Sequence, residues 1–228
     1  MRRLEVVDLG RVRWDEAWAI QRDYVEKRKA GLVPDTLLFA EHPHVITMGR
    51  NAEEQHILAG RDWLAGQGIG VFETDRGGDV TYHGPGQIVG YPIFDVAAWR
   101  KDLRAYVKAL EEAVVRTLGE YSIAAHTREG KETGVYVRRE DGAPAKICAL
   151  GIHMSRWVSS HGFALNWKPE LRYFQLIVPC GLTLPVTSMA ELGVEAEREE
   201  VMQRLTRHLA EIFAHELPAR IEQLQETH

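Results

Sequence analysis

Strand-forming segments occur in groups along this chain and do not alternate regularly with helices. Alternating apolar residues predict strands at 4–9, 36–41, 45–48, 70–74, 79–82, 87–93, 134–138, 145–154 and 158–166. Apolar residues at helical spacing predict helices at about 14–28, 61–67, 97–121 and 198–215. Regular alternation would favour a doubly wound sheet, so this order favours an α+β fold, with helices packed against a mixed or antiparallel sheet.

Three of the predicted helices have a recognisable buried face. For the first helix we expect Trp14, Ala17, Trp18 and Val25 to point inward. The long helix should bury Leu103, Tyr106, Val107, Leu110, Val114 and Leu118, with Lys101, Arg104, Lys108, Glu111 and Glu112 largely on its outer face. The last helix should bury Val201, Met202, Leu205, Leu209, Ile212 and Phe213.

Length and composition predict one ordinary globular unit. A chain of 228 residues with 45% hydrophobic residues suffices for one sizeable core and contains no convincing linker, so we expect a single domain over 1–228. The net charge of -5 gives no general basic surface for nucleic acid or an anionic membrane. No apolar run is long enough to span a membrane or form a signal peptide core, so we expect a cytoplasmic protein.

Cysteine and histidine content limits the kinds of site that the chain can build. The two cysteines, Cys148 and Cys180, are too few for a disulfide framework or a thiolate zinc site, so both should be free thiols. The pair His42 and His44 lacks an acidic or thiol partner at ligand spacing, so we predict no metal.

A glycine-rich segment from Arg76 to Gln87 contains four glycines and a histidine between two predicted strands. A tight hairpin needs only one or two glycines, and backbone without side chains lets a ligand approach main-chain N–H groups. Arg76 and His83 can supply polar groups at the two ends of such a cradle. The segment matches no nucleotide-binding fingerprint, and a structural hairpin remains the alternative.

Two further segments contain residues suited to nucleophilic chemistry. Lys146 begins an otherwise apolar strand, and Cys180 lies between a proline and a glycine in a turn. A thiol with its ordinary pKa of about 8.5 is mostly protonated near neutral pH, so a nearby cation is needed to form the thiolate. A lysine ammonium can serve, although sequence spacing alone leaves open whether these two residues meet, a solvated lysine and a buried thiol being the alternatives.

Taken together, four blocks resemble the lipoyl(octanoyl) transferases of protein lipoylation, also called lipoate-protein ligase B. The blocks are Arg76-Gly77-Gly78 through Tyr91-Pro92, Lys146-Ile147 with Leu150-Gly151, His161 through Asn166, and Pro179 through Leu182. They follow one another in the family's order over roughly half the chain. The resemblance implies a mixed-sheet α/β domain like that of lipoate- and biotin-protein ligases.

The resemblance also implies an activity and its residues. It implies octanoyl transfer from octanoyl-acyl carrier protein to a lysine of lipoyl domains, in 2-oxoacid dehydrogenase E2 subunits and glycine cleavage H protein, without a cofactor. The nucleophile falls on Cys180 and the lysine that lowers its pKa on Lys146. The acyl-binding residues fall on Arg76, Gly77, Gly78, Asp79, Val80, Thr81, Tyr82 and His83, on Ala149, Leu150 and Gly151, and on Gly162, Phe163 and Ala164.

Two other functions remain as alternatives at this point. An ATP-dependent lipoate or biotin ligase of the same fold would activate a free acid and would need no cysteine. A non-catalytic acyl-binding protein would share the tunnel and lack the transfer chemistry. Tyr82, His83 and His161 are candidates to line the site in any of these cases, with ordinary packing as the alternative for each.

Overall fold

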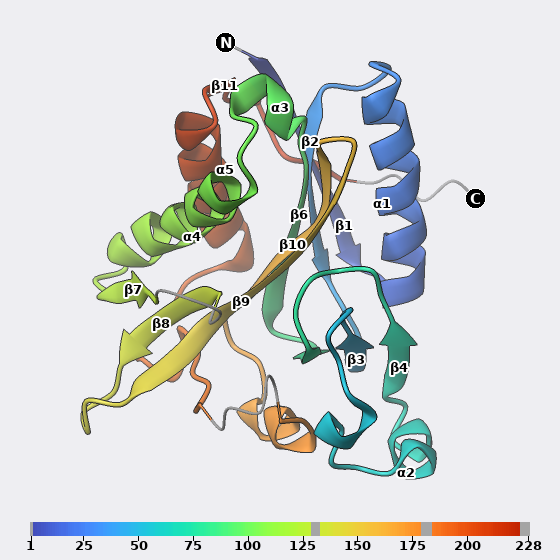
Figure 1. The fold of residues 1–228 in the computed structure, drawn as a ribbon. Coiled ribbons are helices and arrows are strands. Elements are labelled where there is room, and N and C mark those ends of the chain that lie inside the picture. Colours follow the sequence, from blue (N-terminus) through green and yellow to red (C-terminus); the bar gives the residue numbers. More distant parts are fainter. Residues whose placement is uncertain (1, 129–132, 179–183, 224–228) are drawn as a thin grey trace.

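The computed structural model describes residues 2–128, 133–178 and 184–223, and within them the main feature is one large mixed sheet. Its strands lie in the order β11-β1-β2-β6-β10-β9-β8-β7, and β12 pairs with β1 (Figure 1). Their bounds are β1 (Arg2–Arg11), β2 (Asp35–Glu41), β6 (Gln87–Ile93), β7 (Ala125–Thr127), β8 (Gly134–Arg138), β9 (Pro144–Ser155), β10 (Val158–Asn166), β11 (His215–Glu216) and β12 (Glu222–Gln223).

Strand β1 runs parallel to β2, β11 and β12, whereas the pairs from β2 through β6, β10, β9 and β8 to β7 are antiparallel. The predicted class, helices packed on a mixed sheet, is confirmed.

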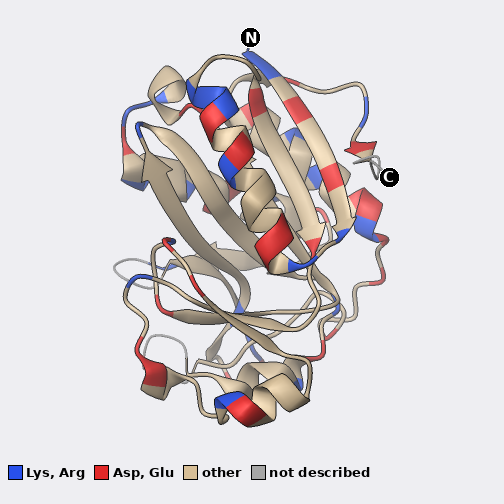
Figure 2. Ribbon diagram, turned by 90° about the vertical axis from the view of Figure 1, so that its right-hand side faces the viewer, with Lys and Arg blue, Asp and Glu red and all other residues tan. Residues whose placement is uncertain are grey.

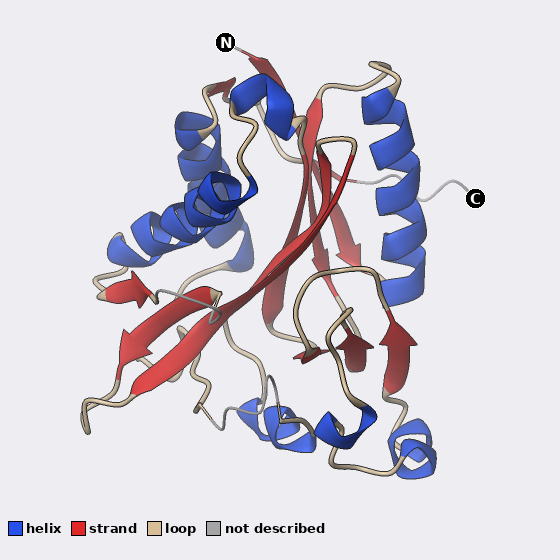
Figure 3. Ribbon diagram, in the orientation of Figure 1, coloured by secondary structure: helices blue, strands red, loops and turns tan. Residues whose placement is uncertain are grey.

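Helices cover both faces of this sheet because its strands carry apolar residues on both sides. Leu37 and Phe39 of β2 point into the main core, which they share with α4 (Leu103–Gly119) and α5 (Arg198–Ile212). Leu38 and Ala40 point to the other face and pack under α1 (Trp14–Lys29). The helices are blue in Figure 3, with α1 on one side of the sheet and α4 and α5 on the other.

A second, smaller sheet lies next to α1, beside the part of the main sheet's face that α1 does not cover. It contains β3 (Val45–Met48), β4 (Gly70–Glu73) and β5 (Val80–His83) in the order β4-β3-β5. Helix α2 (Arg61–Gly66) and the short helices η1 (Glu54–His56) and η2 (Leu171–Leu176) pack around it. The predicted strands and the predicted helix in this part are confirmed, with ends shifted by at most one residue.

Helix α1 shows the expected division between a buried and a solvated face. Trp14, Ala17 and Val25 are buried as predicted, and Gln21 joins them. Trp18, the fourth residue expected to point inward, is only half-buried. Lys, Arg, Asp and Glu residues are mixed along the outer surface of α1 in the view of Figure 2.

The predicted long helix over 97–121 is wrong in its first part. The chain forms a single helical turn, α3 (Val96–Trp99), leaves helical geometry, and begins α4 after Asp102, whose side chain accepts a hydrogen bond from the Ala105 N–H. An Asp at this position caps the free N–H groups of a new helix start, which competes with continuation of the helix. Leu103, expected in the core, is therefore at the first turn of α4 and is 47% exposed.

Glu111 is a second correction on the same helix. Its place in the periodicity predicts the solvated face, but it is only 5% exposed, and its Oε1 accepts a hydrogen bond of 2.8 Å from the Gly134 N–H of β8. Burial raises the pKa of this carboxyl above its usual value, although the hydrogen bond and the charges of Lys108 and Lys146 act in the opposite direction. The strand β8 thus uses a buried carboxylate of α4 as a hydrogen-bond partner.

The last helix also ends earlier than predicted. Helix α5 stops at Ile212, and Ala214 has a left-handed backbone conformation that turns the chain into β11. Of the six residues expected to be buried, five are, and Ile212 is half-buried. Strands as short as β11 and β12 have no periodic pattern of their own, so the sequence could not predict them.

Candidate functional site

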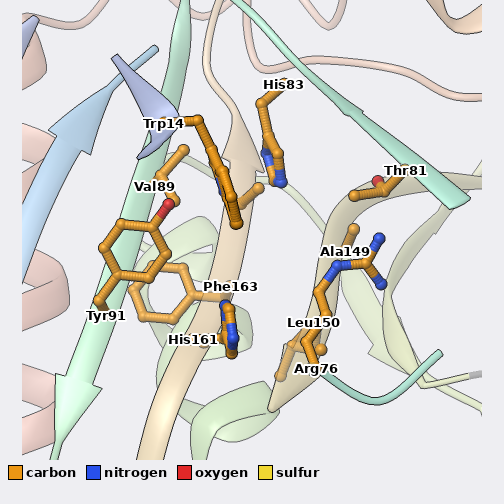
Figure 4. A pocket seen from close by; sticks show the side chains of 13 residues that line it. Trp14, Arg76, Thr81, His83, Val89, Tyr91, Ala149, Leu150, His161 and Phe163 are labelled. Atoms are coloured by element: carbon orange, nitrogen blue, oxygen red, sulfur yellow. The ribbon is translucent and has the colours of Figure 1, made fainter. Parts of the chain in front are cut away.

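A cavity of about 50 Å³ lies between the main sheet and the smaller sheet. Three adjacent strands of the main sheet, β9, β10 and β6, form one wall, and α1, β5 and the loop before β5 contribute the others. The lining residues are Trp14, Arg76, Thr81, His83, Val89, Tyr91, Ala149, Leu150, Gly151, His161, Gly162, Phe163 and Ala164 (Figure 4).

Three predicted acyl-binding segments, distant in sequence, therefore meet at one cavity. Of the fourteen residues that the family resemblance nominates, nine line it, namely Arg76, Thr81, His83, Ala149, Leu150, Gly151, Gly162, Phe163 and Ala164. The wall is largely glycine, alanine and other apolar residues, which suits an apolar ligand of narrow cross-section.

The other five nominated residues do not line this cavity. Val80 and Tyr82 alternate with Thr81 and His83 along β5, and so point away into the core of the small sheet. The Tyr82 hydroxyl bonds His44 Nδ1 at 2.7 Å. Gly77, Gly78 and Asp79 lie in the glycine loop, the name used below for residues 76–79.

The glycine loop is fastened on both sides. The carbonyls of Arg76 and Gly78 accept hydrogen bonds from the N–H groups of Arg50 and Asn51, at 3.0 and 3.1 Å, beside the small sheet. On the other side, the Gly77 N–H donates to the Ile152 carbonyl of β9 at 2.9 Å. The Gly77 N–H, part of the cradle expected from the sequence, is therefore used to hold the loop against β9.

Arg76 lines the cavity mainly as a structural clamp. Its guanidinium donates to the Thr47 carbonyl at 2.5 Å and to Thr47 Oγ1 at 3.0 Å, and Nη1 donates to the Gly77 carbonyl at 3.1 Å. The residue is 7% exposed. These bonds tie β3 to the loop. In Figure 4, Arg76 lies on the opposite side of the cavity from Tyr91.

Asp79 connects the glycine loop, through His56, to Val178. One carboxylate oxygen accepts from the Val80 N–H at 2.7 Å, and the other lies 2.7 Å from His56 Nδ1. The hydrogen bond to Asp79 raises the pKa of His56. The His56 carbonyl in turn accepts a hydrogen bond from the Val178 N–H at 2.8 Å.

His83 supplies a neutral polar group inside the cavity. Burial, and then the charges of His42 and Arg76, hold the pKa of its imidazole well below the ordinary value. Its Nδ1 is buried and has no hydrogen-bond partner among the described residues. In Figure 4 this ring points toward the centre of the cavity, where a ligand can offer it a hydrogen bond.

His161 is held in an unusual backbone conformation on the cavity wall. Its φ of 54° lies in the left-handed region, which non-glycine residues seldom adopt. The Gln21 side chain of α1 accepts a hydrogen bond from the His161 N–H at 3.0 Å, and Nε2 lies 2.7 Å from Asp75 Oδ1. Burial lowers the pKa of His161 despite this carboxylate. Its ring is stacked on Trp14, with centroids 6.5 Å apart and planes 10° apart.

Lys146 lies near the start of β9, three residues before Ala149. An irregularity in the strand pairing decides on which side of the sheet its side chain lies. Tyr136 of β8 pairs with Lys146, whereas Val135 pairs with Cys148, so β9 has one extra residue. Because of this bulge, the successive residues Ile147 and Cys148 both lie in the main core. Lys146 then lies on the same side of the sheet as Ala149, and its Nζ is 5.3 Å from the centroid of the Tyr136 ring.

Cys180 lies outside the described residues. The chain on either side is described, and both flanks are fastened near the site. Before the gap, Val178 bonds His56; after it, Lys146 N–H donates to the Pro185 carbonyl at 2.8 Å, and Thr187 N–H donates to the Lys146 carbonyl at 3.0 Å.

Cys148 has the environment of a structural thiol. It is fully buried in the main core, and burial raises the pKa of its thiol far above the ordinary range. A thiol that stays protonated and inaccessible is a poor nucleophile, so Cys148 is excluded as the reactive cysteine.

The histidine pair before β3 has structural partners. His42 Nδ1 lies 2.8 Å from the Val12 carbonyl, which can only accept, and Nε2 lies 2.7 Å from the Tyr91 hydroxyl. Burial lowers the pKa of His42 to about 4, so the ring is neutral at physiological pH. The described residues contain no group of three or more His, Cys, Asp or Glu arranged to hold a metal ion.

No helix within the described part of the chain has the length and apolar character needed to cross a membrane.

Several cavity residues could not be identified from the sequence. Trp14, Val89 and Tyr91 have the pattern of ordinary core residues of a helix and a strand, and only the packing of α1 beside the small sheet brings Trp14 into the cavity. Asp75 precedes the glycine-rich segment by one residue, yet nothing in its local sequence indicates a bond to His161.

Comparison with known proteins identifies the family from the sequence. The family model described as "Lipoyl protein ligase A/B catalytic domain" matches residues 14–210. The chain is 55% identical to a curated octanoyltransferase of Solibacter usitatus, covering 95% of this chain and 96% of that protein. It is 48% identical to the octanoyltransferase of Koribacter versatilis, covering 92% and 84%.

Among solved structures, the chain is similar to one from a study of an archaeal lipoylation system, with a bipartite lipoate protein ligase and its E2 lipoyl domain, from Thermoplasma acidophilum. The TM-score is 0.75 with 16% identity, covering 98% of this chain and 88% of that one. At this identity the likeness shows a shared fold.

Proposed function

Since the chain belongs to the octanoyltransferases of the lipoyl protein ligase A/B catalytic domain family, we propose that it transfers an octanoyl group from acyl carrier protein to lipoyl domains through a thioester on Cys180. The observation that carries this proposal is the cavity itself, because the residues that line it come from all three predicted acyl-binding segments. Its largely apolar wall suits a fatty chain.

The environment of Lys146 supports its role beside the nucleophile. The bulge in β9 turns Lys146 toward the cavity side of the sheet, and residues 185–187 pair with its backbone on the C-terminal flank of the segment that contains Cys180. An ammonium group near the thiol stabilises the thiolate and lowers the thiol pKa. Cys148 is not available for this role, since it is buried on the opposite face.

In the first step, the thiolate of Cys180 attacks the carbonyl carbon of the octanoyl thioester on acyl carrier protein. The carbon–sulfur bond to the carrier's phosphopantetheine breaks, and the departing thiolate takes a proton, for which Lys146 is the donor. One thioester replaces another, so this step requires no ATP.

In the second step, the lysine ε-amine of a lipoyl domain attacks the thioester on Cys180. An amide bond forms, the bond to the Cys180 sulfur breaks, and the amine loses a proton as the thiol is regenerated. Both protein substrates need the same acyl position, so the carrier must leave before the lipoyl domain binds, and the kinetics should be ping-pong.

The acyl tail lies in the cavity in this proposal. Each buried methylene contributes about 0.8 kcal/mol, so an eight-carbon chain contributes several kcal/mol to binding. Ala149 and Ala164 have only small side chains on this wall and so leave room for it above the sheet, and His83 provides a polar contact near its path.

Modification of lipoyl proteins follows from the family, and the identity of the partners is part of the proposal. We infer that the donor is octanoyl-acyl carrier protein and that the acceptors are lipoyl domains of 2-oxoacid dehydrogenase E2 subunits and glycine cleavage H protein. The cytoplasmic location expected from the sequence remains part of the same proposal, as does a single domain over 1–228.

Intact-mass spectrometry after incubation with octanoyl-acyl carrier protein tests the reaction. We expect a mass gain of one octanoyl group that is lost in Cys180→Ser, retained in Cys148→Ala and discharged by added lipoyl domain. The reaction should proceed without ATP, which distinguishes it from that of a ligase. A protein that binds the octanoyl group but never forms the thioester would refute the proposal and favour a non-catalytic acyl-binding protein.

A further inference from the structure

The cavity is lined by three adjacent strands of the main sheet, β9, which carries Lys146, β10 and β6. Trp14 of α1 lies on the side of the β6 residues Val89 and Tyr91 in Figure 4. We propose that the indole of Trp14 closes the acyl cavity and sets the length of the acyl chain that the protein transfers. This inference rests on the proposed function, because it assumes that the acyl tail occupies this cavity.

The distance across the three lining strands matches the length of an eight-carbon chain. Neighbouring strands lie about 4.8 Å apart, so the distance from β9 across β10 to β6 is about 10 Å. An extended octanoyl group has seven carbon–carbon bonds, each advancing about 1.3 Å along the chain, and so measures about 9 Å. A chain whose reactive end lies beside β9 therefore reaches the β6 side with its terminal methyl group.

Trp14 occupies that side and is held rigidly there. It is 3% exposed, and its ring contacts Phe72 of β4 and Trp18 of α1, with centroids 5.2 and 5.0 Å away. The contact with Phe72 bridges the space between α1 and the small sheet. Figure 4 shows the indole pointing into the cavity, on the side of Tyr91, across from Ala149 and Arg76.

His161 fixes the face of the indole that borders the cavity. The imidazole stacks on Trp14 with nearly parallel planes, and it is itself held by Asp75 at one end and by Gln21, through its backbone, at the other. The Trp14 indole contacts a ring on three sides, so it cannot move aside without breaking these contacts. A longer chain would have to displace it, whereas a shorter chain would leave apolar surface uncovered.

Substitution of Trp14 should therefore change chain-length preference and not only activity. Each additional buried methylene favours binding by about fourfold, so in Trp14→Ala the ratio of kcat/KM for decanoyl to that for octanoyl carrier protein should rise about tenfold. Trp14→Leu should produce a smaller rise. Lipoyl-domain acylation by each carrier protein, measured by mass spectrometry, gives the ratio directly.

Trp18→Ala is the matched control. Trp18 is on the next turn of α1 and contacts both Trp14 and His161, yet it does not line the cavity. Trp18 is half-buried, so Trp18→Ala should lower stability by less than Trp14→Ala while leaving the chain-length ratio within twofold of the wild type. Thermal unfolding of all three variants confirms that folded protein is assayed.

Two results separate the failure of this inference from failure of the proposed function. A wild-type protein that forms no octanoyl thioester on Cys180 would overturn the proposed function. A wild type that forms the thioester, with an unchanged chain-length ratio in folded Trp14→Ala and Trp14→Leu, or an equal rise in Trp18→Ala, would overturn only the role of Trp14.

Discussion

Replacing Gly151 by alanine adds one methyl group where β9 passes under the glycine loop. A Cβ at this position would lie 2.9 Å from the Gly77 carbonyl oxygen and 3.2 Å from Arg76 Cδ. Ordinary van der Waals contacts begin at about 3.4 Å, so the loop would have to move outward by about 0.5 Å. The loop cannot move freely, because the Gly77 N–H is bonded to the Ile152 carbonyl.

The expected loss of stability follows from this overpacking. Inserting a methyl group into a well-packed site typically costs about 1 to 3 kcal/mol. If the loop shifts in the folded protein, the unfolding free energy falls by that amount, which lowers the melting temperature by about 3 °C for each kcal/mol in a protein of this size. The shift also moves Arg76, which lines the cavity, so kcat/KM with octanoyl carrier protein should fall about tenfold or more.

Gly66→Ala is the control for a glycine without a close neighbour. Gly66 lies at the end of α2, has nothing within 4 Å of a built Cβ, and has no left-handed backbone conformation. Alanine there should leave kcat/KM unchanged and raise the unfolding free energy by up to about 1 kcal/mol. Thermal unfolding and steady-state transfer assays on both variants give the comparison. A Gly151→Ala protein with wild-type stability and activity would refute the seating of the loop on β9.

The remaining predictions concern a buried carboxylate and a buried thiol. Asp35→Asn should lower the unfolding free energy, measured in urea, by about 3 kcal/mol. The reason is that it removes the charge that His215 Nε2 and Arg28 Nε contact at 2.7 and 2.8 Å. A loss below about 1 kcal/mol would contradict this account. Burial alone would raise the pKa of Asp35, but the hydrogen bonds from His215, the Asp95 N–H and Arg28 outweigh it and hold the pKa below its ordinary value of 3.8. This stabilisation is complete well above pH 3.8 and is lost as the pH falls through the folded-state pKa, so acid unfolding should be less steep in the variant. Iodoacetamide should leave Cys148 unmodified in the native protein and label it after unfolding, and peptide mass spectrometry showing equally rapid native labelling would contradict its burial.

Local sequence patterns predicted most of the secondary structure correctly. Residues that alternate along β2 and β6, and those at helical spacing in α5, face the core as their periodicity indicates. Two of the errors occurred where a local choice competes with the pattern. At Asp102 an N-cap starts a new helix inside an apolar periodicity, and at Ala214 a left-handed residue ends one.

The candidate site likewise has parts that the sequence predicted and parts that it could not predict. The family resemblance nominated the glycine-rich segment, the segments on β9 and β10, and Lys146, and the structure brings residues of the three segments to one cavity, while the role of Lys146 stays a prediction. The sequence could not predict that Val80 and Tyr82 would face away from the cavity, because the strand boundaries that set this alternation depend on pairing with β3. Nor could it predict Asp75 as the partner of His161, since that contact joins residues 86 positions apart.

Short-range stereochemistry is written along the chain itself, and it determined which segments are helices and strands, which faces are apolar and which residues carry chemistry. Tertiary packing alone decided what those residues meet. The bulge opposite Tyr136 turns Lys146 toward the cavity side, and the packing of α1 beside β4 brings Trp14 into the wall of the cavity. Each depends on contacts between elements remote in sequence, whose geometry is fixed only when the whole core packs together.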